Sequence, residues 1–115
     1  MRKMIVLLAL VCALGVVGGA GAATTTTTTV QVKAGEFFFK LSKTSIAKPG
    51  TVVFTVKNAG HLAHDFKIAG KKTALIQPGK SATLKVKFAK AGKYAYLCTV
   101  PGHASAGMKG RFTVR

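Results

Sequence analysis

The chain has 115 residues, enough for one domain and too few for two, and it carries 18 Lys and Arg residues against two acidic ones. The resulting formal net charge of +16 favours an anionic partner, such as an acidic redox protein or an anionic membrane surface. We expect no nucleic-acid binding, because the sequence contains neither a basic helix nor a groove-reading element. We expect a monomer.

The first 22 residues have the three parts of a secretory signal peptide. Arg2 and Lys3 form a basic start, residues 4–17 are apolar, and Ala20-Gly21-Ala22 fits a cleavage site. The alternative is an uncleaved anchor, since residues 4–23 are uncharged and long enough to span a bilayer. Both alternatives place the domain outside the cytoplasm, in the periplasm or on the outer face of the membrane.

The signal peptide contains one of the two cysteines, Cys12, so the mature domain keeps only Cys98. A lone thiol in an exported protein is an unpaired hazard, an intermolecular bridge or a ligand protected by a metal. Without Arg2 and Lys3, 16 basic residues face Glu36 and Asp65, a net charge of +14.

Residues 23–29 are rich in threonine and are expected to form a flexible or extended leader, the alternative being that they begin the first strand. The domain itself occupies residues 30–115, where apolar and polar residues alternate with a period of two. This alternation predicts strands in residues 29–33, 36–42, 51–58, 64–68, 81–90, 93–98 and 111–115.

Turn signals separate these strands, at Pro49-Gly50, Ala69-Gly70, Pro78-Gly79 and Ala91-Gly92. Many short strands with turns between them, and no helical period, predict an all-β protein. We expect an antiparallel Greek-key β-sandwich of seven to eight strands, with lysines on its solvent faces.

A small set of residues with metal-binding side chains stands out in this pattern. His64 has the same strand parity as Phe66 and Ile68, and is therefore expected to point inward. Cys98 shares the inward parity of Tyr96, and His103 and Met108 follow it in the next loop. Taken singly, each would be an ordinary core residue. Together they form a set that is improbable by chance.

Two imidazoles and a thiolate with a weak methionine ligand are the ligands of a blue-copper electron-transfer site. Such a set suits both Cu(I) and Cu(II), because thiolate and thioether are soft ligands and imidazole is acceptable to both ions. Zinc is the competing metal, but its structural sites prefer four strong ligands, and methionine is a poor one.

Two stretches resemble the cupredoxins, the plastocyanin and azurin group of small blue-copper proteins. IAKPGTVVFTVKNAGHLAHDF is similar to the strands before the first ligand of that family, and GKYAYLCTVPGHASAGMKGRFTV to its ligand loop and last strand. The resemblance covers residues 30–115, and its Cys-x4-His-x4-Met spacing is closest to that of rusticyanin-like bacterial members. It implies one copper ion, bound by His64, Cys98, His103 and Met108.

The resemblance also implies roles for the neighbours of these residues. The Ala63 carbonyl would be an optional weak contact to the metal. Asp65 stands where many members have Asn, and it is expected to bond to Thr99. His103 would be the outlet for electrons, surrounded by an apolar patch made of Pro101, Gly102, Ala104 and Leu62. For His61 we favour a polar loop residue over a second metal site shared with His64.

The function implied is that of an extracytoplasmic one-electron carrier that cycles between Cu(II) and Cu(I), and not of an enzyme. The three histidines of the chain cannot supply the second copper centre that a copper reductase would need. One alternative is a copper-delivery or copper-enzyme assembly protein, against which the complete ligand set argues, since transfer sites favour exchangeable ligands. Another is a polyanion-binding module whose candidate ligands are only core residues.

Overall fold

The computed structural model describes residues 26–115, so the signal peptide predicted for residues 1–22 lies outside the described residues. The described part contains nine strands and no helix long and apolar enough to cross a membrane. The strands are β2 (Thr27–Gly35), β3 (Phe38–Leu41), β4 (Ser45–Ile46), β5 (Gly50–Asn58), β6 (Lys67–Ile68), β7 (Lys71–Lys72), β8 (Ser81–Phe88), β9 (Gly92–Leu97) and β10 (Lys109–Val114).

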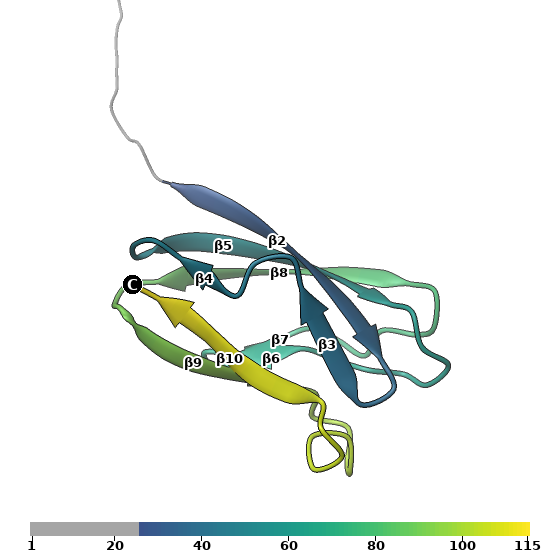
Figure 1. Cartoon of the computed structure of the whole chain (residues 1–115). Helices are drawn as coiled ribbons and strands as arrows, with labels where there is room; N and C mark the ends of the chain where they lie inside the picture. Colours follow the sequence, from purple (N-terminus) through teal and green to yellow (C-terminus); the bar gives the residue numbers. More distant parts are fainter. Residues whose placement is uncertain (1–25) are drawn as a thin grey trace, which may run out of the picture.

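The strands form two sheets that face each other as a β-sandwich (Figure 1). One sheet has the order β4-β10-β9-β6-β7 and the other the order β3-β2-β5-β8. The predicted all-β sandwich is therefore confirmed. Its sheets are mixed, because β2 runs parallel to β5 and β4 runs parallel to β10, while the other pairings are antiparallel.

The threonine run contributes directly to the first sheet. β2 begins at Thr27, and residues 27–29 pair with residues 51–53 of β5. The last three threonines are thus strand rather than leader, which is the second of the two alternatives considered for them. Threonine suits this position, because its branched side chain fits the pleated surface of a sheet.

The core lies between the sheets and is built from the inward-facing residues of each strand. In β5, for example, Val52, Phe54 and Val56 are fully buried, while Lys57 is exposed. The Phe54 ring contacts Phe66 at 5.2 Å and Phe112 at 5.4 Å between ring centroids, so that it joins the two sheets. Such tilted and edge-on contacts are favourable for aromatic rings.

One end of the sandwich gathers the segments that carry the candidate ligands. The β9–β10 loop and the β2–β3 turn lie at this end (Figure 1). Residues 59–66, which connect β5 to β6, reach the same place, because Nδ1 of His64 lies 3.1 Å from Nδ1 of His103 in the β9–β10 loop. The two sheets thus form the rigid support, and the loops form the site.

We expect Phe54→Ala to lower the free energy of unfolding by about 3–5 kcal/mol, because it removes a fully buried ring and leaves a cavity between the sheets. Urea unfolding of the copper-free protein, followed by circular dichroism, measures the change. Lys85→Ala on the exposed face of β8 is the matched control and should change the value by less than about 0.5 kcal/mol. Equal effects of the two substitutions would contradict the assigned core.

Candidate metal centre

The side chains of His64, Cys98 and His103 meet at the end of the sandwich. Their donor atoms lie within 4.8 Å of one another, and the three residues are buried. The two Nδ1 atoms are 3.1 Å apart, and Cys98 Sγ lies 4.0 Å from Nδ1 of His64 and 3.7 Å from Nδ1 of His103. The structure thus brings together three of the four residues that the sequence names as candidate ligands.

These distances fit a single metal ion. Imidazole and thiolate ligands bind at about 2.0–2.3 Å, so that three of them around one ion lie about 3.5–3.7 Å apart. The set contains one soft thiolate and two imidazoles, which suits copper in both oxidation states. The donor set and its geometry therefore fit the metal that the sequence predicts.

Met108 belongs to the same region. Its side chain is fully buried, its N–H donates to the carbonyl of His103 at 3.1 Å, and its carbonyl accepts from the N–H of Cys98 at 3.1 Å. The loop between them is compact, since the N–H of His103 donates to the Val100 carbonyl and that of Ala106 to the Gly102 carbonyl. The backbone thus ties Met108 to Cys98 and His103.

Asp65 connects the two ligand-bearing segments. One carboxylate oxygen accepts the N–H of Thr99 at 2.6 Å, and the other accepts the Thr99 hydroxyl. Thr99 directly follows Cys98, and Asp65 directly follows His64. This carboxylate therefore holds the loop of one candidate ligand against that of the other, as the sequence comparison with Asn-containing relatives suggested.

Asn58 fixes the loop before His64, a role that the sequence did not suggest. Its side chain is fully buried and donates to the carbonyls of Leu62 at 2.7 Å and Ile76 at 2.8 Å. Its oxygen accepts the N–H of Gly60 at 2.8 Å. A period-two pattern could only identify Asn58 as the last residue of a strand, because its partners come from loops distant in sequence.

The turn between β2 and β3 lies against His64 and His103. Sequence reasoning did not suggest this contact either. Glu36 accepts the N–H groups of His61 and, at 2.7 Å, of Leu62, and its Oε1 lies 3.7 Å from Nε2 of His64. The Phe37 ring stands edge-on to His103 at 5.3 Å. Phe37 has a φ of 68°, an unfavourable conformation for a bulky residue, of the kind found at functional sites.

The other residues that the sequence singled out differ in their distance from the cluster and in their exposure. The side chain of His61 is 98% exposed, and it is not part of the three-residue cluster. Ala63 is half-buried, and its expected weak contact to the metal stays a prediction. His103 is 8% exposed, and it is thereby the most accessible of the four candidate ligands.

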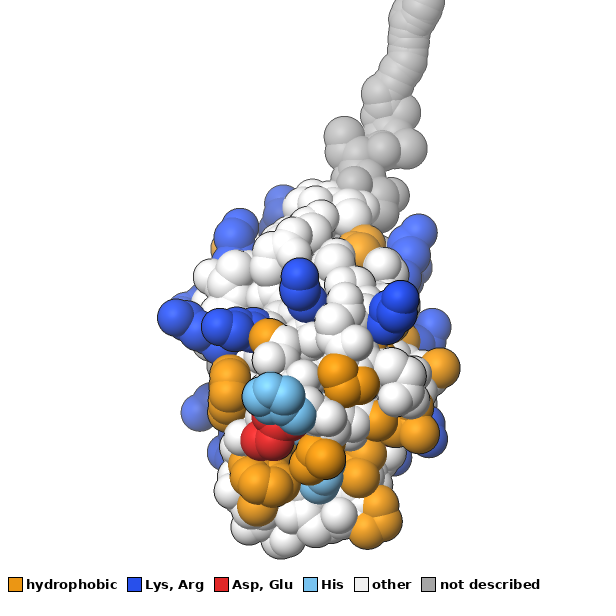
Figure 2. Space-filling model, turned by 90° about the vertical axis from the view of Figure 1, so that its right-hand side faces the viewer, with side chains coloured by type: hydrophobic (Ala, Val, Ile, Leu, Met, Phe, Trp, Pro, Cys, Tyr) orange, Lys and Arg blue, Asp and Glu red, His pale blue; other side chains and the backbone are white. Residues whose placement is uncertain are grey.

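The residues expected to surround His103 are exposed to different degrees. Pro101 and Gly102 are exposed and Ala104 is half-buried, while Leu62 is 47% exposed. The exposed large apolar side chains of the described residues are Phe37, Phe38, Leu62 and Leu75. In Figure 2 the apolar side chains gather around the histidines, and the lysines and arginines lie above and to the sides.

The buried environment sets the protonation of two candidate ligands. Burial lowers the pKa of His64 below its ordinary value of 6.5, and the neighbouring His103 lowers it further. Burial raises the pKa of the Cys98 thiol above its ordinary value of 9.0. At neutral pH, His64 is therefore ready to bind a metal, whereas Cys98 must first lose its proton.

Comparison with known proteins places this geometry in context. A family model described as copper binding proteins, plastocyanin/azurin family, matches residues 12–115. The chain is 24% identical, over an alignment 136 positions long, to the copper-resistant cuproprotein CopI of Pseudomonas aeruginosa, with 75% of each chain covered. The CopI of Rubrivivax gelatinosus is 26% identical over 99 residues, covering 67% of this chain and 59% of that protein.

Auracyanins are similar in sequence over a short stretch and in structure over most of the chain. Auracyanin-B of Chloroflexus aurantiacus is 45% identical over 42 residues, 36% of this chain and 18% of that protein. The structure of dithionite-reduced auracyanin from Roseiflexus castenholzii superposes with a TM-score of 0.69 at 23% identity, covering 83% of this chain and 99% of the other. Auracyanin A of Chloroflexus aurantiacus gives 0.62 at 20% identity, covering 78% and 100%. These structures establish the fold.

The protonation states predict how metal binding depends on pH. Between pH 7 and 8 we expect the Cu(I) affinity to rise about tenfold per pH unit, because binding displaces the proton of Cys98, whose pKa is raised. The slope should steepen only well below pH 6.5, where the pH approaches the lowered pKa of His64 and its imidazole takes up a proton. Competition with a Cu(I) chelator of known pH dependence measures the affinity. Cys98→Ser should abolish the slope above pH 7, and a slope that persists in this variant would contradict the assignment.

Proposed function

Because the chain belongs to the plastocyanin/azurin family of copper-binding proteins, with copper as its cofactor, we propose that it is an extracytoplasmic one-electron carrier. The observation that carries this proposal is the buried cluster of two imidazoles and one thiol, whose donor atoms lie within 4.8 Å of one another. The bound ion would change between Cu(II) and Cu(I), and the protein would transform no substrate.

The proposed ligands are Nδ1 of His64, Nδ1 of His103 and the Cys98 thiolate, with the Met108 sulfur as a weak axial ligand and the Ala63 carbonyl as an optional contact. Fast electron transfer requires that these groups move little between the two oxidation states. The Asp65–Thr99 and Asn58 hydrogen bonds support such rigidity, because they fix the segments on both sides of the cluster.

Electrons would enter and leave through the edge of His103. The largely apolar surface around it would allow close approach of a redox partner with little desolvation of charged groups, Glu36 being the partly exposed exception. The lysines outside this surface would attract an acidic partner protein over a longer range, an effect that salt screens. An anionic membrane surface is the other partner that such a charge suits.

A copper-delivery function is the second candidate. It is favoured by the similarity to two proteins named copper-resistant cuproproteins, at 24% and 26% identity. In that case the site would hold copper for storage or transfer, and partner proteins would take up the ion instead of an electron. The two functions differ in what leaves the site, and they can therefore be separated by experiment.

We expect the purified protein to develop an intense thiolate-to-copper absorption band with one equivalent of Cu(II), together with narrow copper hyperfine splitting in the EPR spectrum. Both features arise from a short bond between copper and a cysteine thiolate. Cys98→Ser should lose the band while keeping the fold. Normal copper binding without this band in the unmodified protein would contradict the proposed ligand set.

The carrier proposal also predicts fast electron self-exchange through the apolar surface, visible as line broadening in NMR spectra of mixed Cu(I) and Cu(II) protein at high salt. Leu62→Glu should slow the exchange at least tenfold, because it places a charge where two copies must touch. Thr83→Glu on the exposed face of β8 changes the net charge equally and should not slow it.

The outcome distinguishes the two candidate functions. Slow exchange in the unmodified protein, with rapid release of copper to a chelator, would favour delivery over electron transfer. Equal rates in the Leu62→Glu and Thr83→Glu variants would show that the apolar surface is not the outlet.

A further inference from the structure

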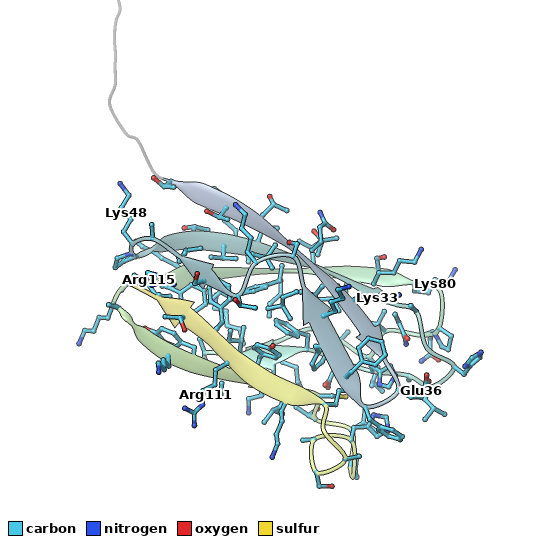
Figure 3. All side chains as sticks on the ribbon, in the orientation of Figure 1. Lys33, Glu36, Lys48, Lys80, Arg111 and Arg115 are labelled. Carbon is cyan, nitrogen blue, oxygen red and sulfur yellow. The ribbon has the colours of Figure 1, made fainter. Side chains whose placement is uncertain are left out.

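The two acidic residues of the mature domain both lie at the candidate copper site, although 16 basic residues surround the rest of the molecule. Asp65 binds Thr99, beside Cys98, and Glu36 lies beside His64. Figure 3 shows Glu36 at the end of the β2–β3 hairpin, whereas the labelled basic residues spread over the remaining surface. Chance placement of both acids at one site is improbable, and only Asp65 was expected there from the sequence.

We propose that Glu36 is a positioning residue of the copper site: its carboxylate holds the loop that carries His64 and keeps a negative charge beside that ligand, which favours Cu(II) over Cu(I). The proposal rests on the proposed ligand role of His64. It concerns the side of the imidazole that faces away from the metal.

The position of the Glu36 carboxylate is fixed by its neighbours. Glu36 Oε1 accepts two consecutive backbone N–H groups, those of His61 and Leu62, which lie three and two residues before His64. A Cβ atom added to Gly60 would lie within 2.8 Å of the three heavy atoms of the Glu36 carboxyl group. The carboxylate therefore occupies a space that only glycine leaves open, and the side chain is 30% exposed.

Nε2 of His64 is the ring nitrogen that would not bind the metal. If Nδ1 binds the metal, the proton of the neutral ring must be on Nε2. Within the described residues, this buried Nε2 has no hydrogen-bond partner, and Glu36 Oε1 lies 3.7 Å away. This distance is too long for a hydrogen bond but short enough for a direct electrostatic interaction. Metal-binding histidines commonly present their second nitrogen to a carboxylate, which orients the ring and increases its basicity.

The negative charge of Glu36 would affect the oxidation state of the copper ion. A negative charge behind a ligand stabilises the more highly charged Cu(II) relative to Cu(I), and it thus lowers the reduction potential. The basic residues on the remaining surface carry positive charge and would raise the reduction potential. Glu36 is close to the ligand and partly shielded from water, so its effect should exceed that of any single exposed lysine.

Glu36→Gln separates the charge from the hydrogen bonds, because the amide oxygen still accepts the N–H groups of His61 and Leu62. We expect its reduction potential, measured by voltammetry, to rise by an amount equal to roughly a tenfold gain in preference for Cu(I), about 59 mV for a one-electron couple. Thr83→Lys adds the same net charge on the exposed face of β8 and should shift the potential by less than a third as much.

Gly60→Ala is an independent variant that displaces the carboxylate without removing its charge, and it should raise the potential in the same direction. An unchanged potential in Glu36→Gln, with the blue-copper spectrum intact, would overturn this inference and leave the electron-carrier function standing. Absence of the blue-copper spectrum from the unmodified protein would instead reject the proposed ligand set, and this inference with it.

A measurement on the copper-free protein tests the loop directly. Hydrogen exchange of the His61 and Leu62 amides should be slow in the unmodified protein, similarly slow in Glu36→Gln, and at least tenfold faster in Glu36→Ala, which lacks the acceptor. Unchanged exchange in Glu36→Ala would show that Glu36 does not hold the loop. The amide of Thr99, bound by Asp65, is the internal control and should not change.

Discussion

The candidate metal centre requires that two imidazole nitrogens and a thiol be held within a few ångströms of one another in the interior of the protein. These groups have no strong attraction for each other, and burying polar groups is unfavourable unless they gain partners. Partners on neighbouring segments provide the support. The side chains of Asn58 and Asp65 and the backbone of Met108 bind the segments on which the donors stand. The two sheets serve as the frame that brings these segments to one end.

The distribution of charge follows from the same requirement. Lysines on the solvent faces of the strands keep the edges of the sheets apart from other chains and add no contact at the metal centre. The two carboxylates are used instead as acceptors for backbone N–H groups near the candidate ligands His64 and Cys98. The end of the molecule where His103 approaches the surface is left apolar. A partner would thus be attracted by the sides of the molecule and would make contact at its end.

Two local rules were sufficient for the sequence to bring the candidate ligands together, and the family resemblance then named them as ligands. Strand parity placed His64 and Cys98 inward, and loop spacing placed His103 and Met108 close to Cys98. Glu36 and Phe37 escaped prediction because their roles depend on how a hairpin turn meets loops 25 or more residues away. Parity also assigns a residue to a face without saying which strands are neighbours. The parallel pairings of β2 with β5 and of β4 with β10 could therefore not be foreseen.

The burial of the candidate ligands supports the proposed electron carrier. Among the four candidate ligands only His103 reaches the surface, and at 8% exposure it offers an edge for electrons but no open path for an ion. Release of copper would require the loop of residues 99–107 to open. That opening would break the hydrogen bonds within the loop, those of Thr99 to Asp65 and the contact of Phe37 with His103. An electron would need none of these changes, and this difference is the structural reason for which we propose electron transfer before delivery.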